Sequence, residues 1–165
     1  MRDIALERKQ IDEAIAGQTL CSVFAETCAR LGDLEAMAIK DPDGKRRAIS
    51  WTTYRERVRD VALGLHSLGV TGFGRGSFGV IMARNRPEHV IADLGIVHAG
   101  ATPVSLYNTL APEQISYIAN HCEARIAFVE NAAFLARFAA IKHALPKLDR
   151  VIVMSGEVPA EADDA

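Results

Sequence analysis

The sequence lacks the features that would identify a membrane protein or a secreted, disulfide-linked domain. No run approaches the ~18 consecutive apolar residues of a membrane-spanning helix, and residues 1–18 are too charged for a secretory signal. There are three cysteines, an odd number, and no pair has the Cys-x-x-Cys spacing of a zinc or redox site. These absences predict a cytoplasmic chain with reduced cysteines and no integral membrane segment.

An excess of charge of one sign is also missing. Lys and Arg total 19 against 21 Asp and Glu, which gives a net charge of -2 and no basic face for nucleic acid. No serine lies in the Gly-x-Ser-x-Gly pattern of a hydrolase. No two histidines have the His-x-x-x-His spacing of a metal site. The five histidines are His66, His89, His98, His121 and His143. We therefore predict no metal-ligating residues and no nucleic-acid partner.

The sequence does contain an alternation of short apolar runs and helical segments from residue 78 onward. Such alternation predicts an α/β fold, here a doubly wound and mostly parallel sheet with helices on both faces. The expected strands are 78–83, 102–106, 125–129 and 150–154, and the expected helices are 87–99, 112–120 and a segment capped by Asn131 with Phe134, Phe138, Ile141 and Leu145 on one stripe.

The part before residue 78 predicts an N-terminal helix and a β-hairpin. Thr19 is expected to cap a helix that ends at Leu31, and Thr52 or Thr53 to cap a second one that ends at Gly69. Between them, 36–40 and 46–51 form a hairpin around 41–44. The predicted organisation is a polar N-terminal arm over 1–18, a globular unit over 19–154, and a disordered acidic tail over 155–165.

Several short motifs occur in order along the second half of the chain. They are Asn85-Arg86-Pro87-Glu88, Ala92-Asp93-Leu94, His98-Ala99-Gly100-Ala101-Thr102-Pro103-Val104, Leu106-Tyr107-Asn108-Thr109-Leu110 and Ile115-Ser116-Tyr117-Ile118. In this order and spacing the chain resembles the adenylate-forming superfamily, and most closely its fatty acyl-CoA ligase branch. The resemblance covers residues 19–154, nearly the whole chain.

The resemblance implies ATP-dependent activation of a fatty acid in two half-reactions. The carboxylate attacks the α-phosphate of ATP to give an acyl-adenylate and pyrophosphate, and the CoA thiol then displaces AMP. Mg²⁺ neutralises phosphate charge, and a lysine from a small C-terminal domain stabilises the transition state. ATP, Mg²⁺ and CoA are thus implied for a complete family enzyme.

The family's catalytic motifs do not occur in this sequence. The Ser/Thr/Gly-rich phosphate loop that ends in Pro-Lys-Gly is missing, as are the Thr-Glu metal motif and the hinge to the C-terminal domain. We therefore assign no catalytic, cofactor-binding or metal-binding residue, and we expect a truncated, incomplete ligase N-domain that is inactive alone. Its expected partner is the remainder of the ligase or a second copy. An interaction module and a small nucleotide-binding protein remain alternative hypotheses.

Four local features suggest chemistry but also have structural interpretations. Gly74-Arg75-Gly76-Ser77-Phe78-Gly79 matches Gly-x-Gly-x-x-Gly, yet a helix precedes it and a strand follows, the reverse of a dinucleotide site. Asp93 lies in an apolar helix one turn after His89, where a solvent-facing position is the simpler interpretation. Tyr107 and Asn108 follow a strand, and we expect an interface there rather than a ligand contact. The basic run 45–47 is expected to be a solvated turn.

The chain departs from the family pattern at Ser77, where the family usually has Asp, at Phe78-Gly79, where it has a basic and a branched residue, and at Ala111. Two of these departures carry an expected cost in stability. Gly79 lies inside an expected strand, where glycine is weaker than alanine by roughly 0.5–1 kcal/mol. Ala111 stands where a serine commonly caps the next helix, at an expected cost of about 1 kcal/mol. Both changes are compatible with relaxed selection on a segment without catalytic function.

Overall fold

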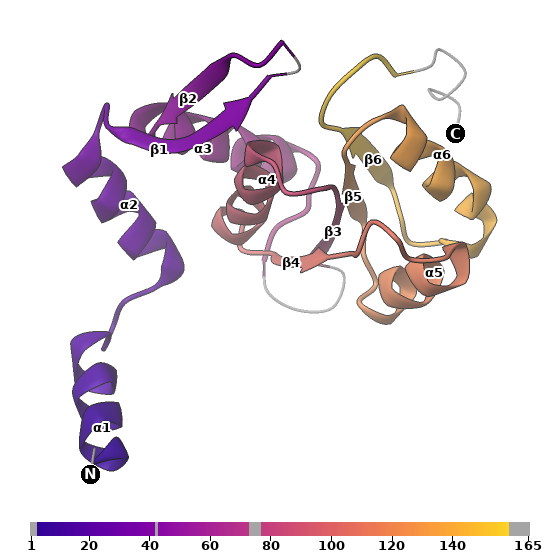
Figure 1. Ribbon diagram of the computed structural model, residues 1–165. Coiled ribbons are helices and arrows are strands. Elements are labelled where there is room, and N and C mark those ends of the chain that lie inside the picture. The colour runs from indigo at the N-terminus through magenta and orange to yellow at the C-terminus, as the bar shows by residue number, and fades with distance from the viewer. Residues whose placement is uncertain (1–2, 42, 73–76, 159–165) are drawn as a thin grey trace.

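The computed structural model describes residues 3–41, 43–72 and 77–158 (Figure 1). The N-terminal part consists of helices and a hairpin, and the C-terminal part is built on a sheet. The helices are α1 (Ile4–Ala14), α2 (Leu20–Leu31), α3 (Trp51–Ser67), α4 (Pro87–His98), α5 (Pro112–His121), α6 (Ala132–Ala140) and the 3₁₀ turn η1 (Lys142–Ala144). Residues 159–165, most of the tail predicted to be disordered, lie outside the described residues.

The sheet contains four parallel strands in the order β4-β3-β5-β6. They are β3 (Phe78–Met82), β4 (Thr102–Ser105), β5 (Ile126–Val129) and β6 (Arg150–Val153). All three pairings are parallel, and Val80 of β3 lies opposite Val104 on one side and Ala127 on the other. The doubly wound parallel sheet predicted from the alternating pattern is confirmed.

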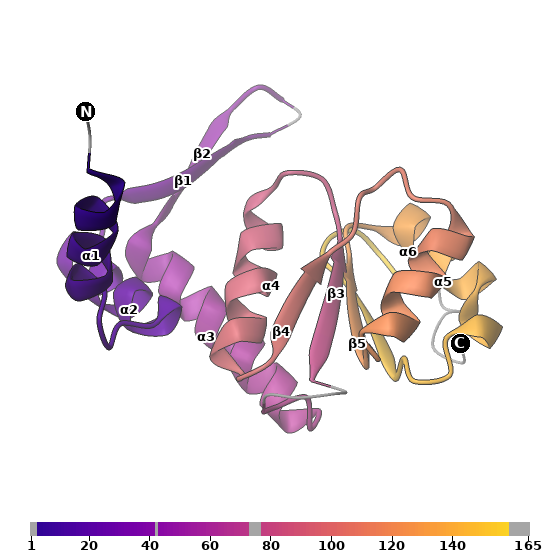
Figure 2. The same ribbon diagram turned by 90° about the horizontal axis from the view of Figure 1, so that it is seen from below.

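Helices cover both faces of this sheet, as Figure 2 shows: α3 and α4 lie on one side, and α5 and α6 lie on the other. Ile81, Ile96 and Ile126 belong to the core on the α4 side. Val80, Ile115 and Phe138 belong to the core on the α5 and α6 side. All four residues of β5 are apolar and buried, as expected for a strand that is covered on both faces.

A third core joins the N-terminal part to α4. It includes Phe24 of α2, Tyr54 and Val58 of α3, and Ile91 of α4. The antiparallel hairpin of β1 (Glu35–Lys40) and β2 (Arg46–Ser50) packs beside it and confirms the predicted hairpin. By contrast α1 has no buried residue, and Figure 1 shows it extending away from the rest of the chain.

The helix caps agree with the sequence at two positions and differ at a third. Thr19 caps α2 and Asn131 caps α6, both as predicted. The prediction that Thr52 or Thr53 caps the next helix is wrong, because Ser50 is the cap and its hydroxyl accepts a hydrogen bond from the Thr53 backbone N–H at 3.2 Å. The chain turns directly from β2 into α3, so the last strand residue takes the capping position.

Two glycines allow α4 to approach its neighbours closely. A Cβ on Gly79 would lie 2.8 Å from Ile96 Cδ1 of α4, and one on Gly95 would lie 2.3 Å from Val61 Cγ1 of α3. Gly79 was interpreted as a weakness of the strand, and the structure instead gives it a packing role. The departure from the family pattern at this position therefore has a structural reason.

Three further details refine the sequence expectations. At Ala111 the helix has no side-chain cap, and the Gln114 side chain accepts a hydrogen bond from the Ala111 backbone N–H at 3.0 Å. Helix α6 ends at Ala140, yet Ile141 and Leu145 still reach the same core as Phe138. In the described residues no helix is long and apolar enough to cross a membrane.

Candidate functional site at the carboxyl end of the sheet

The position between the C-terminal ends of β3 and β5, here termed the crevice, is where an α/β sheet of this kind usually binds a ligand. The chain leaves β3 toward α4 on one face and leaves β5 toward α6 on the other (Figure 2). Since adjacent strands whose connections diverge form a topological switch point, ligands bind outside their carboxyl ends in many such folds. The side chains in this crevice therefore decide whether it can bind anything.

A buried carboxylate fills the crevice. Glu130, the residue after β5, is only 3% exposed. It accepts hydrogen bonds from the Arg84 backbone N–H at 2.8 Å and from Arg84 Nε at 2.9 Å. Arg86 lies behind this pair, with its Nη1 3.8 Å from Glu130 Oε1. Two arginines from the β3–α4 connection thus surround one acid from the β5–α6 connection.

The same cluster connects to the segment after β6. Arg86 donates to Ser155 Oγ at 3.0 Å, and that hydroxyl donates to the Glu130 carbonyl oxygen at 2.9 Å. Arg86 also binds Glu88 at 2.7 Å. We call Arg84, Arg86, Glu88, Glu130 and Ser155 the switch-point network. It joins residues from three connections that are far apart in the sequence.

The electrostatics of the network favour charged carboxylates. Hydrogen bonding from Arg84, opposed by burial, holds the pKa of Glu130 below its usual value. Burial raises the pKa of Glu88, but the Arg86 hydrogen bond and other favourable contacts outweigh it, so this pKa is also lowered. Both acids are therefore ionised at neutral pH and neutralise the arginines beside them. The network is satisfied internally, without a ligand.

A hollow of about 570 Å³ lies next to this network, at the C-terminal ends of β3 and β4. Its walls include Asn85, His89, Ser105, Tyr107 and Asn108. Tyr107 is 80% exposed. The structure thus brings the sequence-predicted residues Tyr107 and Asn108 to one place. Whether they serve an interface, as predicted from the sequence, stays a prediction.

A serine and a histidine in this hollow are hydrogen-bonded. His89 Nε2 lies 2.9 Å from Ser105 Oγ, and Asp93 follows His89 by one helical turn. A hydrolytic triad would need the acid to accept a hydrogen bond from His89 Nδ1, but this atom is buried and has no hydrogen-bond partner among the described residues. Burial raises the pKa of Asp93, and the nearby His89 opposes this rise. The three residues do not form a triad.

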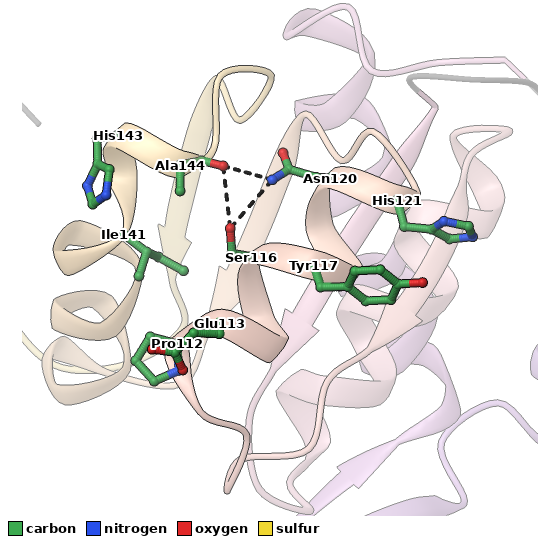
Figure 3. Close-up of a pocket in the computed structure, with 9 residues that line it drawn as sticks. All are labelled: Pro112, Glu113, Ser116, Tyr117, Asn120, His121, Ile141, His143 and Ala144. Carbon is green, nitrogen blue, oxygen red and sulfur yellow. Dashed lines mark hydrogen bonds between the residues drawn. The ribbon is translucent and has the colours of Figure 1, made fainter.

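A second hollow, of about 720 Å³, lies between α5 and η1 (Figure 3). Asn120 Nδ2 donates to the Ala144 carbonyl oxygen at 2.8 Å and fixes η1 against α5. Tyr117 and His121 point away from this bond and stack with their ring centroids 5.9 Å apart. Ser116 also donates to the Ala144 carbonyl oxygen, at 3.4 Å, so the polar groups that meet here bond one another. We therefore assign this hollow a structural role.

The remaining residues singled out from the sequence do not gather at the crevice. Residues 74–76 of the glycine run lie outside the described residues, while Gly79 packs against α4. The basic run pairs with nearby acids, as Lys45 does with Asp43 at 3.1 Å. Within residues 3–41, 43–72 and 77–158 no three His, Cys, Asp or Glu side chains are placed to hold a metal ion. The cysteines are free, and burial raises the pKa values of Cys28 and Cys122.

The switch-point network was not found from the sequence. Arg86 and Glu88 belong to a motif quoted for the resemblance, but Glu130 follows its strand as an isolated acid, 46 positions after Arg84. An acid placed directly after a buried strand is the one available signal. It indicates a side chain at the carboxyl edge of the sheet, but not its partner.

The residues at this edge do not fit an ATP triphosphate. Phosphate binding requires cationic side chains or backbone N–H groups that are free to meet the oxygens. Here Arg84 and Arg86 are bound to carboxylates, and Glu130 places a negative charge in the crevice. We therefore derive no reaction step at this edge.

Comparison with known proteins gives consistent matches. The AMP-binding enzyme family matches residues 24–165. The chain is 33% identical over 162 residues to the long-chain-fatty-acid–CoA ligase heimdall of Drosophila melanogaster, which covers 95% of this chain and 23% of that ligase. It is 37% identical over 112 residues to the uncharacterized protein Rv1549 of Mycobacterium tuberculosis, covering 68% and 61% of the two chains.

A solved structure gives the same picture. The anthranilate CoA ligase AuaEII, in complex with anthranoyl-AMP, superposes with a TM-score of 0.70 and 25% sequence identity. The match covers 86% of this chain and 25% of that ligase. The chain therefore spans about a quarter of the length of each of these two ligases and corresponds to part of their fold.

Proposed function

Because the chain belongs to the AMP-binding enzyme family, we propose that it supplies the N-terminal part of a fatty acid–CoA ligase and is inactive without the rest. The relatives' names support the substrate class, since the Drosophila protein is a long-chain-fatty-acid–CoA ligase. The reaction would be activation of a fatty acid through an acyl-adenylate in the cytoplasm. This location agrees with three free cysteines.

The observation that carries the proposal is the switch-point network. In an open α/β sheet the crevice is the natural ligand site, yet here Glu130 and its arginines occupy it and satisfy one another. We therefore assign this segment a scaffold role in which it supplies a sheet and three packed cores, while ATP, Mg²⁺ and CoA contact residues that complete the ligase fold.

The proposal is tested by fatty acid-dependent ATP–pyrophosphate exchange with Mg²⁺. We expect the purified 165-residue chain to match the blank. We expect exchange from a chimera in which this chain replaces the matched segment of the Drosophila ligase. Exchange by the chain alone would overturn the predicted inactivity. A folded chimera without exchange, beside an active parent ligase, would count against the assignment to fatty acid–CoA ligases.

A further inference from the structure

The two outer strands of the parallel sheet present different edges. On β4, the backbone N–H groups of Thr102 and Leu106 donate to β3, to Ser77 O and Ile81 O at 2.8 Å each. Since N–H groups alternate between the two sides of a strand, Pro103 and Ser105 face outward. Proline has no N–H, so the β4 edge offers a single outward donor. This is a known way to protect a sheet edge.

The β6 edge is open by the same reasoning. The N–H groups of Arg150 and Met154 donate toward β5, to Arg125 O at 3.3 Å and Val129 O at 2.8 Å. Val151 and Val153 therefore direct both N–H and C=O groups outward. Among the described residues no strand pairs with β6 on that side. Two donors and two acceptors thus remain for another strand.

A groove of about 480 Å³ lies beside this edge, between α6 and the start of β6. Its apolar walls include Leu135, Phe138, Leu148 and Val151. Lys142 and Arg150 add positive charge, whereas Asp149 is engaged by Arg125 at 2.6 Å. An extended segment with apolar side chains at alternate positions and a carboxylate near Lys142 would match both the edge and the groove.

We infer that the β6 edge is the surface on which the residues completing the ligase fold add a further strand. This inference rests on the proposed function. The anthranilate ligase superposes over 86% of this chain but only 25% of its own, so three quarters of that molecule continue beyond the shared part. Because Pro103 protects β4, the sheet can be extended by regular pairing at β6, through Val151 and Val153.

Amide hydrogen exchange tests this directly. The outward N–H groups of Val151 and Val153 are expected to exchange quickly in the 165-residue chain. In the chimera with the Drosophila ligase they are expected to exchange about 100-fold more slowly. The outward N–H of Ser105 serves as the internal control and is expected to exchange at similar rates in both proteins.

A pair of proline variants provides a second readout. Val153→Pro removes an outward N–H without breaking a β5–β6 hydrogen bond, and Ser105→Pro does the same on the β4 edge. Val153→Pro also loses packing against the core, so each variant is compared with itself in the two proteins. Val153→Pro should lower Tm more in the chimera than in the 165-residue chain, whereas Ser105→Pro should change Tm equally in both, because only β6 has gained a partner.

The outcomes separate the two claims. Unchanged exchange at Val151 and Val153 in a folded chimera would overturn the inference, even if the chimera is an active ligase. Protection at both residues in an inactive chimera would support the inference while contradicting the proposed ligase function. Protection in the 165-residue chain that disappears on dilution would identify a second copy as the occupant and would also overturn it.

Discussion

The crevice at the switch point and the outer edge of β6 lie on the same sheet but satisfy their polar groups in opposite ways. In the crevice, Glu130 and its arginines use one another, and a residue 3% exposed keeps its charge. At the β6 edge, the outward backbone groups of Val151 and Val153 have no partner strand among residues 3–41, 43–72 and 77–158. The comparison shows where the chain is self-sufficient and where it depends on other residues.

The largest expected effect on stability comes from removing Glu130, the acid in the crevice. Glu130→Ala removes the carboxylate that Arg84 binds and that Arg86 lies beside, and it empties a packed position. We expect a loss of about 3 kcal/mol in the free energy of unfolding, at the low end for a broken buried pair because Arg84 can be hydrated. Urea denaturation measures this. A loss below about 1 kcal/mol would mean that the network is not structural.

The pH dependence of stability sharpens the same contrast. The pKa of Glu130 is lowered in the folded chain, so its contribution is fully present above the unfolded value of about 4.3 and is lost as pH falls through the folded value. Between pH 7 and 5 this contribution should be constant. Below about pH 4 the wild type should lose stability more steeply than Glu130→Gln, which cannot titrate there.

Arg86→Ala removes the centre of the network but leaves the Arg84–Glu130 pair. Arg86 binds Glu88 and Ser155, and its side chain is mostly buried. We expect the free energy of unfolding to fall by about 2 kcal/mol. The pKa of Glu88 should also rise, because burial would then be less opposed. Chemical-shift titration of Glu88 distinguishes this from general loosening, which would not affect one carboxyl alone.

Ser155→Ala tests whether the network fixes the segment that follows β6. The hydroxyl accepts from Arg86 and donates to the Glu130 carbonyl oxygen. Loss of both bonds should lower the free energy of unfolding by about 1 kcal/mol. Faster exchange at the Ser155 backbone N–H, which bonds Glu130 O at 3.1 Å, is the accompanying readout. Unchanged exchange would show that the backbone bond alone holds this segment.

The smallest effect on stability is expected from Pro103→Ala. It adds an outward N–H to β4 without altering a β3–β4 hydrogen bond. The free energy of unfolding should therefore change by less than about 0.5 kcal/mol. Self-association should nevertheless increase, because the protected edge is now open. Sedimentation velocity over a concentration series measures this, with Ser105→Pro as the opposite control.

The sequence predicted the strands and helices of the sheet well but not the contents of its crevice. Apolar runs such as 126–129 and caps such as Asn131 are local patterns, and local patterns survive in the fold. At the β2–α3 turn, hydroxyls at Ser50, Thr52 and Thr53 compete within four positions, and pattern alone selected the wrong one. Glu130 finds its partner 46 positions away, which no spacing rule reaches.

Pro103 also bears on the order in which the strands of the sheet pair during synthesis. Ribosomal synthesis proceeds from the N-terminus, so β3 and β4 emerge before β5 and β6. The first pair to form carries its protected edge on the outside, and each later strand is added on the opposite side, β5 beside β3 and then β6 beside β5. Growth in chain order is therefore one-sided, because each strand after β4 joins the edge opposite Pro103.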